Sequence, residues 1–344
     1  MRTLSGAVRS WIGNQEGVDW NDFKSNFNNP LRVIIGSSEE GDLGQLSFQG
    51  VWLLKGDKRL YPVPIHLLKK EYENVLYPLQ LSEQGIYCDL GNSIRLAELS
   101  SDEAQGAKPM EDTWVDAQTL GVILQGEIPT YDEQHFVTLN QLVKQESRVG
   151  IARNNKKRAV ETGLLYQTQQ IRPKADVSVE IDIQGLPESC QQSDNILLRL
   201  GGEGRTATVT HSQPTQLPAP KVNTKDVRGV VLYLLSPLQL KDHRQMLPGF
   251  ELIDTQQPNH WQGEIHGIAL ILNGAITGKS IRDGGWNLAE GKPRISMSLI
   301  PAGSLFFCQV KEGDIQKAVN ALHGKQIGEK QNYGYGHLAV GLWQ

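Results

Sequence analysis

Cysteine is scarce in this chain of 344 residues, which holds three of them, Cys88, Cys190 and Cys308. They lie far apart, form no CxxC pair and are odd in number, so the sequence predicts neither a zinc site nor a disulfide framework. Long apolar runs are absent too, so no membrane-spanning helix is predicted. The N-terminal stretch MRTLSGAVRSWIG lacks the apolar segment of a signal peptide. These absences favour a protein of the reducing cytoplasm.

Motifs of familiar enzyme classes are also missing. TGKS at 277–280 ends like a phosphate-binding P-loop, but only three residues separate Gly274 from the GK pair, where that motif needs four. There is no GxSxG or HExxH sequence. His260, Glu264 and His266 could be drawn as a metal trio, yet ordinary packed or exposed histidines explain them more simply. The sequence therefore predicts no catalysis, no metal and no cofactor.

The overall composition is typical of a globular protein. Apolar residues make up 39% of the chain and charged residues 21%, which is enough for a packed core. The length favours two domains. The net charge of −4 argues against a protein that coats nucleic acid with its whole surface, although it is compatible with a local basic groove.

The clearest fold signal lies in the C-terminal third. GVVLYLLSPLQL at 229–240 is almost continuously apolar, which predicts a strand in the centre of a sheet. Strands at 263–274 and 303–310, a helix at 314–324 with Asp314 as its N-cap, and a final strand follow. This order fits a ferredoxin-like α+β domain, with a helical layer on an antiparallel sheet.

The first 211 residues could form a second, embellished copy of such a domain. An amphipathic helix is expected at 3–14, VSVEIDIQG at 177–185 alternates as a half-buried strand does, and 149–173 predicts two strands around a polar loop. The stretch 212–226, with three prolines and few large apolar residues, is the best linker candidate. We therefore expect an α+β protein of two ferredoxin-like (RRM-like) domains with antiparallel sheets and inserted loops, at residues 1–211 and 229–344, joined by a linker at 212–228.

Cationic and aromatic residues gather in several predicted loops. RNNKKR at 153–158 places four positive charges within six residues, and a solvated charge run or phosphate contact by a hairpin explains it equally well. Arg205 follows a glycine-rich turn. Lys279 and Arg282 lie in another glycine-rich loop, where Trp286 is better explained as a packing residue. Dispersed loop residues of these types commonly hold single-stranded RNA, through phosphate contacts and base stacking.

The segment GEKQNYGYGHLAVGLWQ at 328–344 is rich in glycine and tyrosine. Glycine lets a partner approach the backbone closely, exposed N–H groups attract anions, and tyrosine rings offer faces on which bases stack. Taken alone, the segment is more simply explained as a turn before a last strand. The candidate RNA-binding residues are Arg153, Lys156, Lys157, Arg158, Arg205, Lys279, Arg282, Gly328, Lys330, Tyr333, Gly334, Tyr335 and Gly336.

Six stretches, in order along nearly the whole chain, resemble those of one family, the third subunit of the Cmr complex, a type III-B CRISPR effector. They are RTLSGAVRSWI (2–12), WVDAQTLGVILQGEIP (114–129), ESRVGIARNNKKRAVETGLLYQTQQIRP (146–173), LRLGGEGRTA (198–207), PAGSLFF (301–307) and GEKQNYGYGHLAVGLW (328–343). The first is similar to the family's T-L-x-G-A-x-R helix, and the third to its E-x-R-V-G-I…G-x-L-Y…R block. The family belongs to the RAMP superfamily, which is built from ferredoxin-like domains with a glycine-rich loop near the C-terminus.

The resemblance implies an RNA-binding subunit without catalytic activity. Such a subunit sits near the 5′-handle end of the CRISPR RNA and docks the large polymerase-like subunit and a backbone RAMP subunit. Cleavage of the target and synthesis of cyclic nucleotides belong to other subunits. By this resemblance the loop 328–336 approaches the RNA backbone closely, with Gly328, Gly334 and Gly336 as the residues carried over.

One departure from the family concerns the start of the chain. Family members open with a β-strand before the T-L-x-G-A-x-R helix, whereas here Met1 directly precedes that helix. The first strand of a ferredoxin-like sheet is central, so its loss would leave unpaired backbone groups. We therefore expect the N-terminal domain to have a missing or substituted strand.

Three other interpretations stay open. A RAMP-type endoribonuclease that processes CRISPR precursor RNA is the main alternative. Such enzymes often use an early histidine as acid or base, and the first histidine here, His66, lies far beyond the first helix. The chain could also be the equivalent subunit of another type III variant, or an unrelated α+β protein whose glycine loop is a turn.

Overall fold

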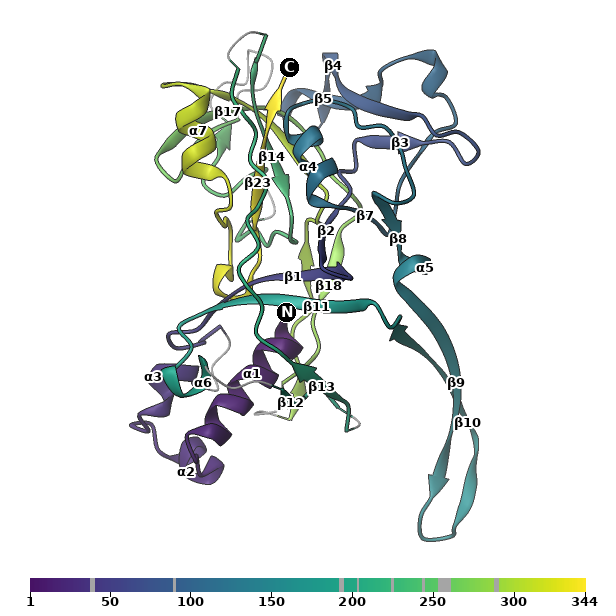
Figure 1. Cartoon of the computed structure of the whole chain (residues 1–344), viewed down its shortest axis with the longest axis vertical. Helices are drawn as coiled ribbons and strands as arrows, with labels where there is room; N and C mark the ends of the chain where they lie inside the picture. Colours follow the sequence, from purple (N-terminus) through teal and green to yellow (C-terminus); the bar gives the residue numbers. More distant parts are fainter. Residues whose placement is uncertain are drawn as a thin grey trace.

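The computed structural model describes residues 1–37, 41–88, 91–191, 195–202, 204–223, 226–242, 245–252, 261–287 and 291–344. Within them the chain is a mixed α+β protein with several antiparallel sheets and few helices, as predicted (Figure 1). The helices are α1 (Arg2–Gln15), α2 (Trp20–Ser25), α3 (Leu31–Ile35), α4 (Ala117–Leu124), α5 (Leu139–Leu142), α6 (Glu188–Gln191), α7 (Ile315–Leu322) and the short 3-10 helices η1 (Asp102–Ala104) and η2 (Gln331–Tyr333). None of these helices has the length and apolar character needed to cross a membrane.

The largest sheet is formed by the C-terminal part of the chain. Its order is β15-β16-β17-β22-β14-β23, with antiparallel pairing throughout. Strand β14 lies between β22 and β23, which confirms the central strand predicted from its apolar run. The strands are β14 (Gly229–Leu234), β15 (Glu251–Leu252), β16 (Trp261–Ile265), β17 (Ile268–Ile276), β22 (Leu305–Val310) and β23 (Leu338–Trp343).

Helix α7 confirms the helix predicted at 314–324. The Asp314 carboxylate accepts a hydrogen bond from the Lys317 N–H at 2.6 Å, which satisfies one of the free donors at the helix start. Gly324 follows the last turn with a φ of 73°, a conformation that glycine adopts without steric cost. Local sequence signals were therefore enough to place both ends of this helix.

The single strand predicted at 263–274 is wrong, because two strands, β16 and β17, occupy this region. They form a hairpin that turns at His266 and Gly267, whose φ angles of 47° and 78° are both positive. Two-residue turns with positive φ at both positions match the twist of paired strands. The turn is so short that the apolar pattern runs on through it, which explains the error.

The N-terminal part contributes a five-stranded antiparallel sheet with the order β11-β1-β2-β7-β8. No strand precedes α1 among the described residues, and this sheet does not show the βαββαβ order of a ferredoxin-like domain. In the C-terminal sheet, the described residues include one of the two helices that this order requires. The prediction of two ferredoxin-like domains is therefore not confirmed. The strands are β1 (Ser47–Lys55), β2 (Lys58–Pro62), β7 (Thr113–Val115), β8 (Phe136–Thr138) and β11 (Val177–Gln184).

Smaller sheets surround these two. One has the order β5-β4-β3-β6, and β12 pairs with β13. Their strands are β3 (Leu67–Lys69), β4 (Leu76–Cys88), β5 (Gly91–Leu99), β6 (Lys108–Pro109), β12 (Ile196–Arg199) and β13 (Thr206–Val209).

The apolar core joins the two parts of the chain. One cluster of buried side chains combines Trp52, Tyr61 and Phe136 from the N-terminal part with Tyr233 and Phe307 from the C-terminal part. The predicted linker contains no helix or strand in its described residues, although Pro220 within it is buried. Because the two parts share this apolar core, their positions relative to each other are fixed by packing.

Candidate nucleic-acid interface

The most prominent feature of the surface is a long hairpin of strands β9 (Val143–Asn154) and β10 (Ala159–Pro173), which projects from the body (Figure 1). The two strands form a sheet of their own. The predicted pair of strands is confirmed, but the loop between them is shorter than expected. At the tip, the Asn154 side-chain oxygen accepts hydrogen bonds from the backbone N–H groups of Lys156 and Lys157, at 3.1 and 3.0 Å. The polar side chain thus shapes the turn that presents the cations.

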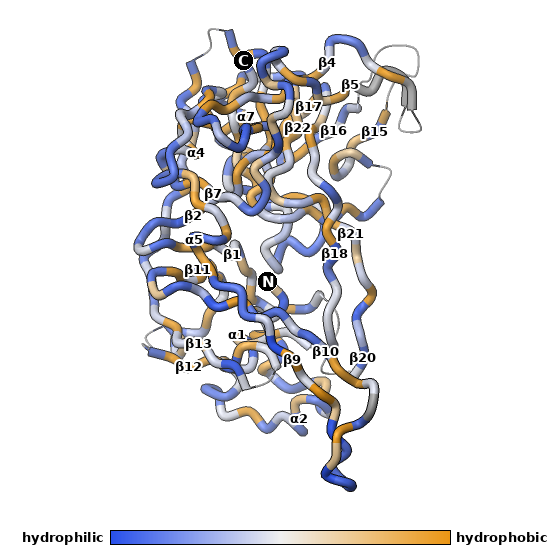
Figure 2. Tube along the Cα trace, turned by 90° about the vertical axis from the view of Figure 1, so that its right-hand side faces the viewer, coloured by the Kyte–Doolittle hydropathy of each residue, from blue (hydrophilic) through white to orange (hydrophobic). Residues whose placement is uncertain are grey.

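The four predicted cations, Arg153, Lys156, Lys157 and Arg158, are all exposed at this tip, where Figure 2 shows the chain as hydrophilic. Arg158 has a φ of 52°, a left-handed conformation that is uncommon outside glycine and is found in turns. The structure brings these four side chains together at the end of the hairpin, away from the core. Such a cluster of positive charge on a protruding element can contact phosphates without desolvating the body of the protein.

The two faces of the hairpin differ in chemistry. Register places Ile151 opposite Leu165, so these two share a face with Val149 and Ile171, because alternate residues of a strand point the same way. The side chains opposite one another between Gln145 and Ile151 on this face are uncharged. The other face is charged, and there Glu146 forms ion pairs with Arg172 at 2.7 Å and Arg148 at 3.4 Å.

Large apolar side chains are exposed along this hairpin to an unusual extent. They are Val149, Ile151, Val160, Leu164, Leu165, Tyr166 and Ile171, each 52–70% exposed. An isolated two-stranded sheet is marginally stable in water, and both of its edges offer unpaired backbone groups. On the uncharged face Val149, Ile151 and Leu165 lie together, and exposed apolar surface of this kind marks an interaction site. Sequence reasoning missed this face, although the alternation of apolar residues in 149–171 was available as a signal.

Arg205 lies near the base of the hairpin rather than at its tip. Its guanidinium donates a hydrogen bond to the Gln170 side chain of β10 at 2.9 Å, from the turn between β12 and β13. The structure therefore connects this turn to the hairpin, as a support for β10.

The glycine loop at 328–336 is packed against the rest of the protein. Gly328, Gly334 and Gly336 have φ angles of 79°, 85° and 67°, which favour glycine. A Cβ atom on any of them would clash with a backbone carbonyl: Gln239 at Gly328, Gly50 at Gly334 and Ile327 at Gly336. Close packing within the protein thus explains the three glycines, and contact of this loop with RNA stays a prediction.

Tyr333 and Tyr335 point into the core and are each 7% exposed, within a cluster that includes residues of α1 and β1. The Tyr335 hydroxyl donates a hydrogen bond to Asp283 at 2.6 Å, and Asp283 also forms an ion pair with Arg2 at 2.8 Å. Burial and this carboxylate raise the pKa of Tyr335 to about 12. In this arrangement the two rings offer no face to a base, so the expected stacking does not fit the geometry. Lys330 directly precedes η2 and has the left-handed conformation.

Lys279 and Arg282 are exposed, and they belong to a second projecting element, described below, that contains Trp286. The expectation that Trp286 packs in the core is wrong, because its side chain is 58% exposed. Sequence reasoning missed it as a candidate, and the two glycines that precede it were the available signal of an exposed turn. Thus the structure separates the predicted residues into a hairpin tip, a packed glycine loop and a second arm.

His337, immediately after the glycine loop, is buried against Trp52, with ring centroids 5.3 Å apart. Burial lowers its pKa from 6.5 to about 3, and the nearby His323 and Arg59 add to the effect. Because the unfolded chain binds the proton more readily, this residue's contribution to stability is complete above about pH 6.5 and declines as the pH falls. We expect a loss of about 2 kcal/mol in the free energy of unfolding between about pH 6.5 and about pH 5.

Urea unfolding at a series of pH values, for the natural chain and for His337→Gln, checks this expectation. The variant should depend less steeply on pH in that window, because it has lost one group that the unfolded chain protonates first. Parallel curves for the two proteins would show that His337 is not responsible.

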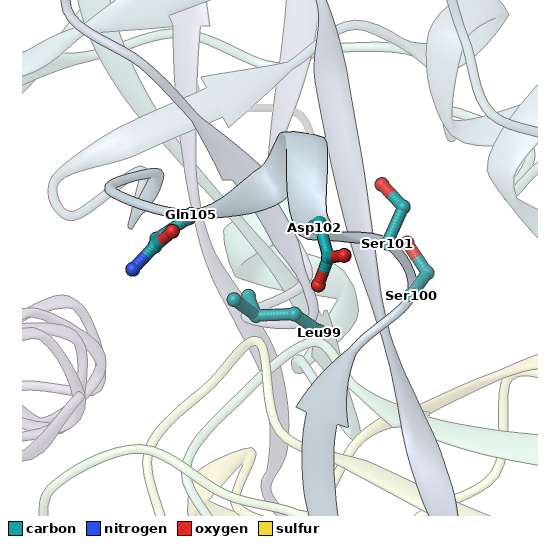
Figure 3. Close-up of a pocket in the computed structure, with 5 residues that line it drawn as sticks. All are labelled: Leu99, Ser100, Ser101, Asp102 and Gln105. Atoms are coloured by element: carbon teal, nitrogen blue, oxygen red, sulfur yellow. The ribbon is translucent and has the colours of Figure 1, made fainter.

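Two other features do not belong to the interface. A hollow of about 570 Å³ beside η1 is lined by Leu99, Ser100, Ser101, Asp102 and Gln105 (Figure 3). Its charged residue is an acid, so it is not suited to phosphate. The part of the chain that the structure describes contains no group of three metal-binding side chains, and His260 of the rejected metal trio lies outside that part.

Comparison with known proteins gives one family match. The sequence matches the protein-family model Cas_Cmr3, described as a CRISPR-associated protein, over residues 1–343. Two chains from cryo-EM structures are similar to this one. One is from the Type III-B Cmr-beta complex bound to cognate target RNA and AMPPnP, in state 1, with a TM-score of 0.45, 15% identity and coverage of 89% of this chain and 76% of that chain. The other is from the same type of complex bound to cognate target RNA, with a TM-score of 0.45, 17% identity and coverage of 89% and 74%. No curated protein sequence matches the chain.

Proposed function

Because the chain belongs to the Cmr3 family of CRISPR-associated proteins, and is thus a subunit of a type III-B effector, we propose that it holds the 5′-handle end of the CRISPR RNA. In this role it docks the large polymerase-like subunit and a backbone RAMP subunit. The family model matches residues 1–343. The two ferredoxin-like domains that the family resemblance implies are part of the same proposal.

The observation that carries the RNA-binding proposal is the cationic tip of the β9–β10 hairpin. Arg153, Lys156, Lys157 and Arg158 project together beyond the body, in a protein whose net charge is −4. RNA backbone is the polyanion that a type III-B subunit meets, and the local positive charge overcomes the repulsion expected from the acidic average. The shape of the element lets it reach RNA that is held by neighbouring subunits.

Replacing the four tip cations with serine is expected to weaken RNA binding and its dependence on salt. If all four contact phosphate, the slope of log affinity against log salt should fall by about 3, since each contact with single-stranded RNA contributes about 0.7. The measurement is binding of labelled CRISPR RNA to the tagged chain, together with the subunits that purify with it, over a range of salt concentrations. A matched control replaces four exposed lysines outside the hairpin, Lys108, Lys221, Lys311 and Lys317, so that net charge changes equally. Equal effects of the two variants would mean that only net charge matters.

The uncharged face of the hairpin supports the docking part of the proposal. Val149, Ile151 and Leu165 present apolar surface that a protein partner can cover, and the strand edges can pair with a partner's strand. We expect Val149→Ser with Leu165→Ser to reduce the amount of the neighbouring subunit that co-purifies. The tip variant should leave that amount unchanged, which separates docking from RNA contact.

We also propose that the chain binds RNA without cleaving it. Burial lowers the pKa of the first histidine, His66, to about 4, so its imidazole is neutral near pH 7 and has no proton to donate as a general acid. Cleavage of precursor RNA by the purified chain, with divalent metal chelated, would favour the endoribonuclease instead.

A further inference from the structure

A second element projects from the protein between residues 279 and 299. The proposed function assigns roles to the hairpin and the glycine loop, but none to this element. Strand β18 (Ile281–Asp283) pairs with β21 (Met297–Leu299), and beyond them β19 (Trp286–Asn287) pairs with β20 (Lys292–Pro293). We call this element the tryptophan arm. It runs along one edge of the molecule in Figure 2.

Trp286 faces away from the body of the protein. The next residue, Asn287, is buried, and successive residues of a strand point to opposite faces. Pro293 is directly opposite Trp286 and is exposed with it. The backbone holds this geometry, because the Arg294 N–H donates to the Gly285 carbonyl at 2.8 Å and the Gly291 N–H donates to Asn287 at 2.9 Å. The indole is thus a large flat surface presented by the paired strands β19 and β20.

The arm is positively charged around this surface. Between residues 279 and 299 the sequence has four cations, Lys279, Arg282, Lys292 and Arg294, against two acids, Asp283 and Glu290. Asp283 is engaged with Arg2 and Tyr335, as described above. These contacts attach the base of the arm to α1 and to the glycine loop, so the arm starts beside the segment that family resemblance associates with RNA.

We propose that Trp286 is a stacking platform for an unpaired base of the bound RNA, with Lys279 and Arg282 contacting the adjoining phosphates. The proposal rests on the proposed RNA-binding function and names a contact that it did not include. An aromatic face flanked by cations is how proteins hold single-stranded RNA independently of sequence. A protein partner is less favoured here, because the exposed apolar residues of the arm are interspersed with glycines and cations, whereas no charged residue separates Val149, Ile151 and Leu165 on the uncharged face of the hairpin.

The test compares Trp286→Ala with Trp286→Phe in the tagged full-length chain and the subunits that purify with it. The probes are labelled oligouridylate and the same RNA with one abasic position. Loss of one stacked base costs about 1–3 kcal/mol, so Trp286→Ala should weaken binding about 5- to 150-fold, whereas Trp286→Phe keeps most of the affinity. The slope with salt should not change, because no phosphate contact is removed. Circular dichroism confirms that each variant is folded.

Two controls distinguish stacking from other roles. Ile295→Ala removes another exposed apolar side chain of the arm, and Tyr72→Ala removes an exposed aromatic ring elsewhere; neither should weaken RNA binding. Crosslinking first identifies the nucleotide that lies at the arm. When that nucleotide is abasic, the affinity of the natural chain for the RNA should be about as low as that of Trp286→Ala for the intact RNA.

Each outcome has a distinct meaning. If Trp286→Ala binds RNA normally while the hairpin-tip variant does not, the stacking proposal is overturned and the proposed function stands. If Trp286→Ala and Ile295→Ala both release a co-purifying protein without changing RNA affinity, the arm is a protein-docking element and the proposal is also overturned. If the natural assembly contains no RNA, the proposed function itself fails.

Discussion

Replacing Arg59 with alanine is expected to lower the free energy of unfolding by about 3–5 kcal/mol, because it leaves a buried carboxylate without its partner. Arg59 lies on β2 and is buried. Its guanidinium forms ion pairs with two acids of β11, Glu180 at 2.7 Å and Asp182 at 3.1 Å. Strand β1 lies between β2 and β11, so the ion pairs reach across one intervening strand.

The side chains around Arg59 cannot take over its role as the partner of Glu180 and Asp182. The ring of Trp52 lies 5.1 Å from the Arg59 guanidinium, and its indole N–H donates to Asp182 at 3.2 Å. The Ser212 hydroxyl donates to the second oxygen of Glu180 at 2.6 Å. Water cannot easily reach Glu180 once the cation is gone, so the charged form of that residue becomes costly.

Urea unfolding followed by circular dichroism measures this effect, with Arg153→Ala as the control. Arg153 is exposed at the hairpin tip, so its loss should change stability by less than about 0.5 kcal/mol. The double variant Arg59→Met with Glu180→Gln should be less destabilised than the sum of its single changes, since no charge is left unpaired at Glu180. A loss below about 1 kcal/mol for Arg59→Ala would show that the cluster is hydrated and not important for stability.

Strand β11 also shows how far the sequence could predict the fold. The alternation in VSVEIDIQG at 177–185 correctly predicted a strand. Burial does not follow this alternation throughout, however: Ile181 and Ile183 pack against the core, but Glu180 is buried as well, while Val179 is half exposed. The reason is not local: Arg59, 121 residues earlier, neutralises Glu180 across the sheet. A single sequence does not reveal such a partner, so pattern alone favours the apolar face.

In the candidate site, too, the features set by nearby residues could be predicted from the sequence, and those set by residues distant in the chain could not. The exposure of the hairpin-tip cations could be predicted, because a polar turn between two strands is exposed whatever the direction of those strands. The orientation of Tyr335 could not, since it depends on Asp283, which is 52 positions away in the chain. Trp286 was misjudged because tryptophan is buried more often than not, and its exposure follows from how β19 pairs with β20.

Replacing Gly336 with alanine is expected to destabilise the protein by about 2–5 kcal/mol. The left-handed conformation costs a residue with a side chain about 1–2 kcal/mol, and forced overpacking adds about 1–3 kcal/mol. The φ of Gly336 is 67°, and an added Cβ atom would overlap the carbonyl oxygen of Ile327. That oxygen cannot move away freely, because the Ile327 N–H donates to the Gly336 carbonyl at 3.0 Å and the Gly336 N–H donates to Pro237 at 2.9 Å.

Gly17 provides a matched control for this change. Its φ is also 67°, but nothing lies within 4 Å of the position that a Cβ atom would occupy. Gly17→Ala should therefore carry only the conformational cost of about 1–2 kcal/mol. The difference between the two variants in urea unfolding isolates the steric part, and equal losses would mean that the glycine loop yields to the added atom.

The same pair of variants separates packing from RNA contact at the glycine loop. If the loop serves only to pack β23 against β14 and β1, Gly336→Ala should reduce stability while the folded protein binds RNA as the Gly17→Ala protein does. If the loop also lies against RNA backbone, the folded Gly336→Ala protein should bind RNA more weakly than that control, because a methyl group stands where a phosphate approaches. Measuring affinity well below the denaturation midpoint keeps the two effects apart, so that a stability loss alone is not mistaken for a lost RNA contact.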